Sequence, residues 1–219
     1  MNIAIDGPAG AGKSTIAKKL AKDLGYIYVD TGAMYRAMAL FFINSGVDLN
    51  DEKAVSSKCD EVKIDITYED NTQQVILNGE NVTGKIRAEE VGNAASVTSV
   101  YKAVREKLVL LQRDMASRCD VVMDGRDIGT AVLPNAKLKV YLTASSTIRA
   151  KRRALELEEK GLNADVDKIK ADIEERDMRD MSREISPLTQ AEDAVLVDSS
   201  EMGIDEVVDA IKKLVESRA

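Results

Sequence analysis

Histidine is absent from the 219 residues of this chain, and cysteine occurs only twice. The lack of histidine excludes a Ser-His-Asp triad, a histidine general base and histidine metal ligands. The two cysteines, Cys59 and Cys119, do not form a C-x-x-C pair. Small isolated thiols are therefore favoured over a metal site or a disulfide.

Long hydrophobic runs and an excess of positive charge are also missing. No apolar run approaches the length of a membrane span, and no signal-peptide pattern opens the chain. The formal net charge of −7 argues against a protein that coats nucleic acid. We therefore expect one cytoplasmic domain over residues 1–219, with neither nucleic acid nor membrane as a partner. We also expect a monomer, because the predicted elements leave no apolar stripe unused.

A glycine-rich stretch near the first residue fits a phosphate-binding motif. Residues 2–6 are typical of a short buried strand, and apolar residues after position 13 recur at helical spacing. The motif G-x-x-x-x-G-K-[ST] is matched between them at every fixed position. The residues expected to bind ATP here are Gly7, Pro8, Ala9, Gly10, Ala11, Gly12, Lys13, Ser14 and Thr15.

The chemistry of this motif is specific. Backbone N–H groups of the glycine loop and the positive end of the following helix dipole bind phosphate oxygens. Lys13 would lie among the β- and γ-phosphates, and Ser14 would be a ligand of Mg²⁺. The sequence therefore predicts binding of a nucleoside triphosphate with magnesium.

Strands and helices alternate along most of the chain. Further core strands are predicted at 26–30, 120–124, 139–143 and 194–198. Helices are predicted at 33–44, 89–99, 101–117, 146–160, 167–183 and 203–218, with Thr31-Gly32 as a break before the first of these. The last helix is expected to bury an apolar stripe from Ile204 to Leu214. This alternation predicts an α/β fold with five core strands.

A period of two residues interrupts this pattern. Residues 62–68 alternate between apolar and polar, and 74–77 form a second apolar run after a predicted turn at 69–72. Asn78-Gly79 is a strong hairpin signal leading to 80–83. We expect a small antiparallel β insert over about 62–84.

Arginines gather at or just beyond the predicted strand ends. They are Arg36, Arg126, Arg149, Arg152, Arg153, Arg176, Arg179 and Arg183. Three of them, at 149, 152 and 153, would give one helix a cationic face, although acidic residues at 156–159 could equally pair with it. Because arginine binds phosphate oxygens bidentately, the set predicts an acceptor that is itself a phosphate ester. Such an acceptor is already largely ionised and needs no general base. A hydroxyl acceptor would need a carboxylate base, and Asp124 or Asp127 could serve.

Six segments together resemble the bacterial cytidylate kinase family. They are 7–14, 30–36, 86–91, 93–96, 124–130 and 175–183, in order and at the spacing of the family. The resemblance extends from residue 2 to about 215. It implies transfer of the γ-phosphoryl group of ATP to CMP or dCMP. It also implies a P-loop NTPase-type three-layer fold with a five-stranded parallel sheet, an acceptor-binding region over about 31–118 and a short helical lid over about 146–162.

The resemblance implies roles for individual residues as well. The cytosine would be read by Ser96, Arg105 and Asp127. The acceptor phosphate would be held by Arg36, Arg126 and Arg183. The sugar would be contacted by Arg176 and Asp180, with Thr31 near the same nucleotide. The lid would carry Arg149, Arg152 and Arg153, with Arg152 on ATP. The catalytic set would be Lys13, Arg126, Arg149, Arg153 and Arg183.

Two other functions stay open at this point. One is a P-loop kinase for another small acceptor, such as UMP, AMP or a hydroxyl compound. The other is a module that binds ATP without turnover, which the dense second set of arginines argues against. A GTPase is disfavoured because the chain has no N-K-x-D guanine signature.

Overall fold

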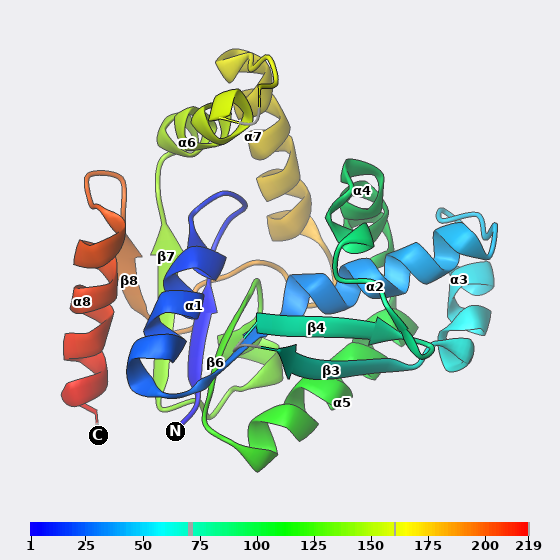
Figure 1. Cartoon of the computed structure of the whole chain (residues 1–219), viewed down its shortest axis with the longest axis horizontal. Coiled ribbons are helices and arrows are strands. Elements are labelled where there is room, and N and C mark those ends of the chain that lie inside the picture. The colour runs from blue at the N-terminus through cyan, green and yellow to red at the C-terminus, as the bar shows by residue number, and fades with distance from the viewer. Residues whose placement is uncertain (70–71, 160, 219) are drawn as a thin grey trace. The chain divides into compact units, whose positions relative to one another are not determined.

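The computed structural model describes residues 1–69, 72–159 and 161–218, which form two compact units (Figure 1). The first unit contains Met1–Tyr28 and the described residues from Cys119 onward. The second unit contains Val29–Arg118. The predicted α/β fold is confirmed, with a five-stranded parallel sheet and a separate three-stranded antiparallel sheet.

The first unit is built on the larger sheet, whose strand order is β2-β6-β1-β7-β8. The strands are β1 (Ile3–Asp6), β2 (Ile27–Asp30), β6 (Val121–Gly125), β7 (Leu138–Thr143) and β8 (Val195–Asp198). The helices are α1 (Lys13–Leu24), α6 (Ser146–Glu159), α7 (Val166–Ser182) and α8 (Ile204–Glu216). The chain runs from β1 through α1 to β2 on one side of β1, and later passes from β6 to β7 on the other side. The loop after β1 therefore lies at a topological switch point, where open α/β sheets bind ligands.

The core of this unit lies between the central strands and two helices. Strand β1 is buried along its whole length, as is typical of the middle strand of a parallel sheet. Ile16 and Leu20 of α1 and Val208 and Ile211 of α8 belong to the same buried cluster as β1 and β7. Helix α1 ends at Gly25, whose φ of +70° closes the last turn and whose N–H donates to the carbonyl of Ala21. This packing holds the start of α1 firmly behind the glycine loop.

The second unit consists of helices and a small antiparallel sheet. Its helices are α2 (Thr31–Asn44), α3 (Glu52–Lys58), α4 (Glu89–Thr98) and α5 (Lys102–Arg118), with 3₁₀ turns at Cys59–Glu61 and Lys85–Arg87. The sheet has the order β3-β4-β5, with strands Ile64–Glu69, Thr72–Leu77 and Glu80–Asn81. Asn78 and Gly79 join the last two strands with φ values of +48° and +89°. Positive φ at both central residues is the geometry that Asn-Gly favours, so the predicted hairpin is confirmed.

Some predicted elements are wrong in detail. Thr31-Gly32 is not a break, because α2 begins at Thr31 and the Asp30 carboxylate caps it by accepting a hydrogen bond from the N–H of Ala33 at 2.8 Å. Ile204 does not belong to a buried stripe, since it is 52% exposed at the first turn of α8. A π-helical turn at Ile128–Val132 follows β6 and had no signal in the periodicity. Residues 70–71 of the expected turn and residue 160 of the expected helix lie outside the described residues.

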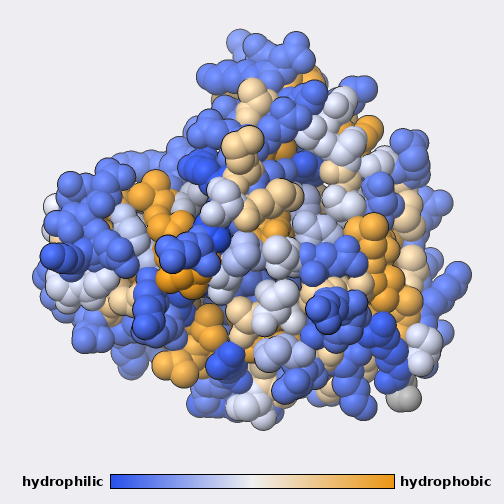
Figure 2. Space-filling model, turned by 180° about the vertical axis from the view of Figure 1, so that it is seen from behind, coloured by the Kyte–Doolittle hydropathy of each residue, from blue (hydrophilic) through white to orange (hydrophobic). Residues whose placement is uncertain are grey.

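The described helices include none that is long and apolar enough to cross a membrane. Figure 2 shows one face of the molecule, on which hydrophilic residues predominate and apolar groups are interspersed. The large apolar side chains that are exposed include Leu110, Leu155, Met178 and Met181.

Candidate active site

The loop between β1 and α1 has the backbone of a phosphate cradle. Gly10 and Gly12 have φ values of +73° and +82°, a region that residues with a side chain rarely adopt. A Cβ atom on Gly7 would lie 1.9 Å from the carbonyl oxygen of Leu142 on the neighbouring strand β7. Glycine is therefore required both for the curl of the loop and for its close approach to the sheet.

Lys13 is the first residue of α1 and is only 6% exposed. Its Nζ donates a hydrogen bond to the carbonyl of Pro8 at 2.7 Å, across the mouth of the loop. Burial lowers the pKa of this ammonium well below its usual range, and the charge of Arg126 lowers it further, while Asp124 and Asp6 oppose the shift. The site thus brings cations together although proximity costs them electrostatic energy, which is the pattern expected of an anion-binding site.

Ser14, the next residue, is hydrogen-bonded to the end of a different strand. Its Oγ donates to Oδ2 of Asp124 on β6 at 2.8 Å, and the phenol of Tyr28 on β2 donates to Oδ1 at 3.0 Å. Hydroxyl and carboxylate oxygens are the ligands that Mg²⁺ prefers, and Mg²⁺ in such sites takes its other ligands from water and phosphate. Ser14 and Asp124 therefore fit a magnesium ion bound together with a nucleotide.

Asp6, at the end of β1, anchors the loop that follows β6. Its carboxylate accepts hydrogen bonds from the N–H groups of Ile128 at 2.8 Å and Gly129 at 2.7 Å. Burial raises the pKa of Asp6 to about 6, against the two backbone donors, which lower it. The segment that contains Asp127 is therefore held against the strand that leads into the phosphate cradle.

Helices α6 and α7 lie beyond the carboxyl ends of the strands, on the side of the β1–α1 loop (Figure 1). Arg149 of α6 donates from Nη1 to the carbonyl of Ala9 at 2.7 Å and from Nε to the carbonyl of Ala144 at 2.9 Å. Asp177 of α7 accepts from the N–H of Ala9 at 3.1 Å and pairs with Arg149 at 2.7 Å. One buried ion pair thus satisfies both backbone groups of Ala9 in the middle of the cradle.

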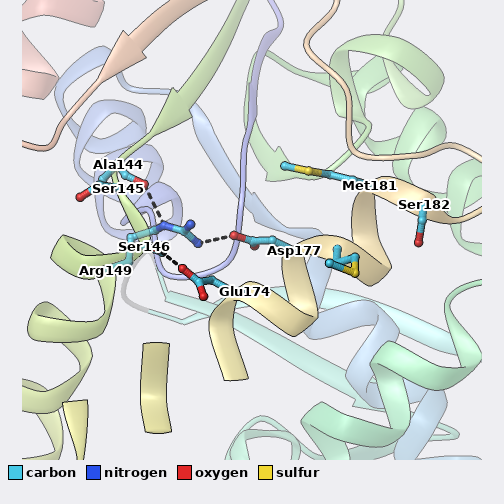
Figure 3. Close-up of a pocket in the computed structure, with 9 residues that line it drawn as sticks. Ala144, Ser145, Ser146, Arg149, Glu174, Asp177, Met181 and Ser182 are labelled. Carbon is cyan, nitrogen blue, oxygen red and sulfur yellow. Dashed lines mark hydrogen bonds and ion pairs between the residues drawn. The ribbon is translucent and has the colours of Figure 1, made fainter. Parts of the chain in front are cut away.

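Figure 3 shows this ion pair at the wall of an open groove of about 560 Å³. A second link between the two helices, from the Ser146 hydroxyl to the Glu174 carboxylate at 2.7 Å, lies beside it (Figure 3). The groove is lined by Ala144, Ser145, Ser146, Arg149, Glu174, Asp177, Met178, Met181 and Ser182. The groove and the cradle therefore share Arg149 as a common wall.

The three arginines of α6 share one side of the helix by their spacing but have different surroundings. Arg149 is buried against the cradle. Arg152 donates to the carbonyl of Ser199 at 2.6 Å, in the segment after β8. Arg153 is exposed and pairs with Glu156 at 2.9 Å. Their spacing on the helix is regular, but each guanidinium meets a different part of the unit.

Two ion pairs join the loop after β6 to the end of α7. Arg126 donates from Nε to Asp180 at 2.8 Å, and Arg183 lies 3.6 Å from Asp127. Burial raises the pKa of Asp180, but the charge and hydrogen bond of Arg126, together with the charges of Arg176 and Arg183, outweigh it, so the pKa lies below the usual range. Two neighbouring residues of the loop, Arg126 and Asp127, are thus paired with Asp180 near the end of α7 and with Arg183 just after it.

In the second unit, the candidate residues lie on α2, α4 and α5. Arg105 of α5 is buried, with its guanidinium carbon 5.9 Å from the centre of the Tyr35 ring. Thr31 is buried at the first residue of α2, and Arg36 follows just over one turn later. Ser96 is half-buried on α4. These residues combine cations, hydroxyls and an aromatic ring, which are groups suited to a nucleotide.

The sequence has close relatives over its full length. A family model described as cytidylate kinase matches residues 3–217. The cytidylate kinase of Lactobacillus johnsonii is 50% identical over 218 residues, covering 100% of this chain and 95% of that protein. The cytidylate kinase of Caldicellulosiruptor saccharolyticus is 52% identical over 214 residues, covering 98% and 95%. The chain belongs to the cytidylate kinase family.

Solved structures extend the likeness at the level of the fold. An uncharacterized protein from Eubacterium ventriosum matches with a TM-score of 0.56 at 15% identity, covering 100% of this chain and 99% of that one. The shikimate kinase of Bacteroides thetaiotaomicron matches with a TM-score of 0.51 at 14% identity, covering 99% and 98%. The fold of this cytidylate kinase family member is therefore also found in a kinase with another acceptor, and its own acceptor must be argued from residues.

Three residues that hold the site together were missed in the sequence. Asp6 and Asp177 act on backbone groups far along the chain, and Gln73 does the same in the second unit. The sequence could have indicated a role for Asp6, because a carboxylate at the end of a buried strand must find hydrogen-bond partners. It gave no such indication for Asp177 and Gln73, since polar residues at those positions of a helix or strand are expected in solvent.

Proposed function

We propose that this protein transfers the γ-phosphoryl group of ATP to CMP or dCMP, giving ADP and CDP or dCDP. One observation carries the proposal beyond membership of the family. The guanidinium groups of both Arg126 and Arg176 lower the pKa of Lys13 through their charge, after the larger effect of burial. Asp124 and Asp6 offset part of this electrostatic cost, and a polyanion bound at Lys13 would offset it further.

The transfer itself needs no general base in this chain. A phosphate oxygen of CMP attacks the γ-phosphorus in line, and the bond from the γ-phosphorus to the β,γ-bridging oxygen breaks, so that ADP leaves with that electron pair. The CMP phosphate is already largely ionised at neutral pH, which agrees with the absence of histidine. Lys13 stabilises charge on the transferring group, and Arg36, Arg126 and Arg183 hold the acceptor phosphate.

Ser14, with Asp124 beside it, would hold Mg²⁺. The ion would neutralise charge on the β- and γ-phosphate oxygens when bound. Tyr28 orients Asp124 through its hydrogen bond of 3.0 Å. Arg149 and Arg153 are proposed to act on the triphosphate from the lid and Arg152 to contact ATP, so their surroundings would change when a nucleotide binds.

Base selection is assigned to Asp127, Ser96 and Arg105. Cytosine presents an amine donor and the N3 and O2 acceptors, which match a carboxylate and two donors. Uracil would instead present a carbonyl oxygen to Asp127, and the unpaired contact would be unfavourable. Thr31 and Arg36 are assigned to the acceptor nucleotide, and Arg176 and Asp180 to its sugar. The cytoplasmic location and the monomeric state stay predictions.

An acceptor panel tests the proposal. ADP release would be measured with MgATP and CMP, dCMP, UMP, AMP, GMP, shikimate or no acceptor. Turnover confined to CMP and dCMP is expected. Turnover with another acceptor alone would keep the cradle and overturn the base assignments, and ATP binding without any turnover would favour a binding module.

The variant Lys13→Ala separates chemistry from folding. It should abolish turnover while the far-ultraviolet circular dichroism spectrum stays that of the wild type. Lys18→Ala is the matched control, because Lys18 is exposed on the same helix. Full activity of Lys13→Ala would contradict the catalytic assignment.

A further inference from the structure

The three-stranded sheet of the second unit has a glutamine on its buried side. Strand β4 buries Gln73, Val75 and Leu77, and Gln73 is only 8% exposed. Burying a side-chain amide is unfavourable unless its donor and acceptor both find partners. A glutamine between positions taken by valine and leucine therefore points to a specific contact.

That contact is with the backbone of Asp30. The Oε1 atom of Gln73 accepts a hydrogen bond from the N–H of Asp30 at 2.8 Å. Its Nε2 donates to the carbonyl of Asp30 at 3.3 Å. The side-chain amide thus pairs with both backbone groups of one residue, as a neighbouring strand would, at the point where β2 ends.

The carboxylate of Asp30 organises the start of α2. It accepts from the N–H of Ala33 at 2.8 Å and from Nη2 of Arg87 at 3.1 Å. Arg36 borders the space beside Gly32 that this carboxylate also borders. A Cβ atom built on Gly32 would be 3.3 Å from Oδ1 of Asp30 and 3.5 Å from Nη1 of Arg36, so both groups border the same small space.

We propose that Gln73 is a positioning residue for the acceptor phosphate. The three-stranded sheet holds Asp30 through Gln73, Asp30 fixes the first turn of α2, and that turn orients Arg36. The β insert thereby has a role in acceptor binding although none of its own side chains needs to contact CMP. The inference rests on the proposed function, because it assigns the acceptor phosphate to Arg36.

The test compares two neighbouring glutamines. Gln73→Met keeps the length of the side chain and removes both hydrogen bonds to Asp30. Gln74→Met is the matched control, because the side chain of Gln74 bonds to Thr72 and Asn81 within the small sheet. The dissociation constants of CMP and ATP would each be measured by calorimetry, with the steady-state KM for both substrates. Gln73→Met should raise the dissociation constant of CMP roughly tenfold, as expected for the loss of buried hydrogen bonds. The dissociation constant of ATP should stay within about twofold of the wild-type value.

Two further variants show whether the effect passes through Arg36. Gln73→Leu also removes both hydrogen bonds to Asp30 with an apolar side chain, so CMP binding should weaken about as much as in Gln73→Met. Arg36→Lys should weaken the binding of CMP and not that of ATP. In the double variant with Gln73→Met, the dissociation constant of CMP should rise by less than the product of the two single fold-changes. If Gln73→Met does not fold, Gln73→Leu carries the same comparison.

Each outcome decides the inference. Unchanged CMP binding in the Gln73 variants would overturn it, and so would equal weakening of CMP and ATP, which indicates general loosening. If the fold-changes that Gln73→Met and Arg36→Lys cause in the dissociation constant of CMP simply multiply in the double variant, Gln73 does not act through Arg36. A wild-type protein that does not bind CMP would instead contradict the proposed function, which keeps the two failures apart.

Discussion

Arg149 and Asp177 form a buried ion pair of 2.7 Å whose two members also bind the carbonyl and the N–H of Ala9. The pair joins two helices that follow β7 to the centre of the phosphate cradle. Buried ion pairs are costly to break because one charge is left without a partner. The conformation of the cradle is thus coupled to the positions of α6, which lies in the expected lid over about 146–162, and of α7.

The variant Asp177→Ala tests this coupling. It leaves Arg149 buried without its carboxylate and Ala9 without the acceptor of its N–H. The free energy of unfolding should fall by about 3 kcal/mol, and the KM for ATP should rise more than the KM for CMP. Chemical denaturation and steady-state kinetics measure the two effects.

The matched control is Glu175→Ala on the same helix. Glu175 is exposed and lies 3.7 Å from Arg179, so its removal should cost less than about 1 kcal/mol. Equal losses in the two variants would contradict a special role of the buried pair.

Asp6 makes the stability of the protein depend on pH. Its pKa is raised by burial from 3.8 to about 6. Between these values the folded state binds a proton more tightly than the unfolded state, so this residue's contribution to stability falls as the pH rises and is constant above the folded value. The change across the window is about 3 kcal/mol.

The variant Asp6→Asn isolates that contribution. Other titrating groups are common to both proteins, so the stability of the wild type minus that of the variant should fall between pH 4 and pH 6 and then level off. Unfolding by denaturant at several pH values measures it. A difference that does not change with pH would show that Asp6 does not titrate in this window.

Tyr28 is expected to affect the metal through Asp124. Tyr28→Phe removes the hydrogen bond to Oδ1 of Asp124 and leaves the bond from Ser14 to Oδ2 in place. The Mg²⁺ concentration at half-maximal activity should rise by about tenfold, as outer contacts of metal sites do. Binding of MgATP measured by calorimetry at several Mg²⁺ concentrations should show the same shift.

Tyr26→Phe is the control, because Tyr26 packs against the core cluster in the same part of the chain. It should leave the Mg²⁺ dependence unchanged. A shift of the same size in both variants would indicate a general change in the sheet and not an effect on Asp124.

Asp127 is expected to determine the choice of base. In Asp127→Asn the amide can donate a hydrogen bond to the carbonyl that uracil presents, so the ratio of kcat/KM for CMP to that for UMP should fall by at least about tenfold. The KM for ATP should stay within about twofold. An unchanged ratio would remove Asp127 from base selection.

The pair with Arg183 makes a control necessary. Asp127 lies 3.6 Å from Arg183, so part of any effect could come from that arginine. Arg183→Lys should impair turnover with both bases equally, since it is assigned to the phosphate. A change of base preference in this variant would move the assignment from Asp127 to the pair.

Local patterns predicted much of this protein. The glycine loop, the start of α1 at Lys13 and the Asn78-Gly79 hairpin depend on backbone conformations that particular residues favour. The five core strands were recognisable as short apolar runs, of which β1 is buried along its whole length and β8 only in part. Such features need only neighbours in the sequence, which is why they were predictable.

Only the tertiary structure decided which polar groups meet. The contacts of Asp6 with Ile128, of Asp177 with Ala9 and of Gln73 with Asp30 each join segments that no local pattern links. Arginines of α6 at regular spacing likewise have different partners, because a guanidinium on a long side chain follows the nearest acceptor and not the face of its helix. The sequence by itself thus determined the phosphate cradle and the strands that carry it. The polar contacts that hold the cradle, the β6 loop and the start of α2 in place were decided by long-range packing, since a hydrogen bond depends on where both partners lie.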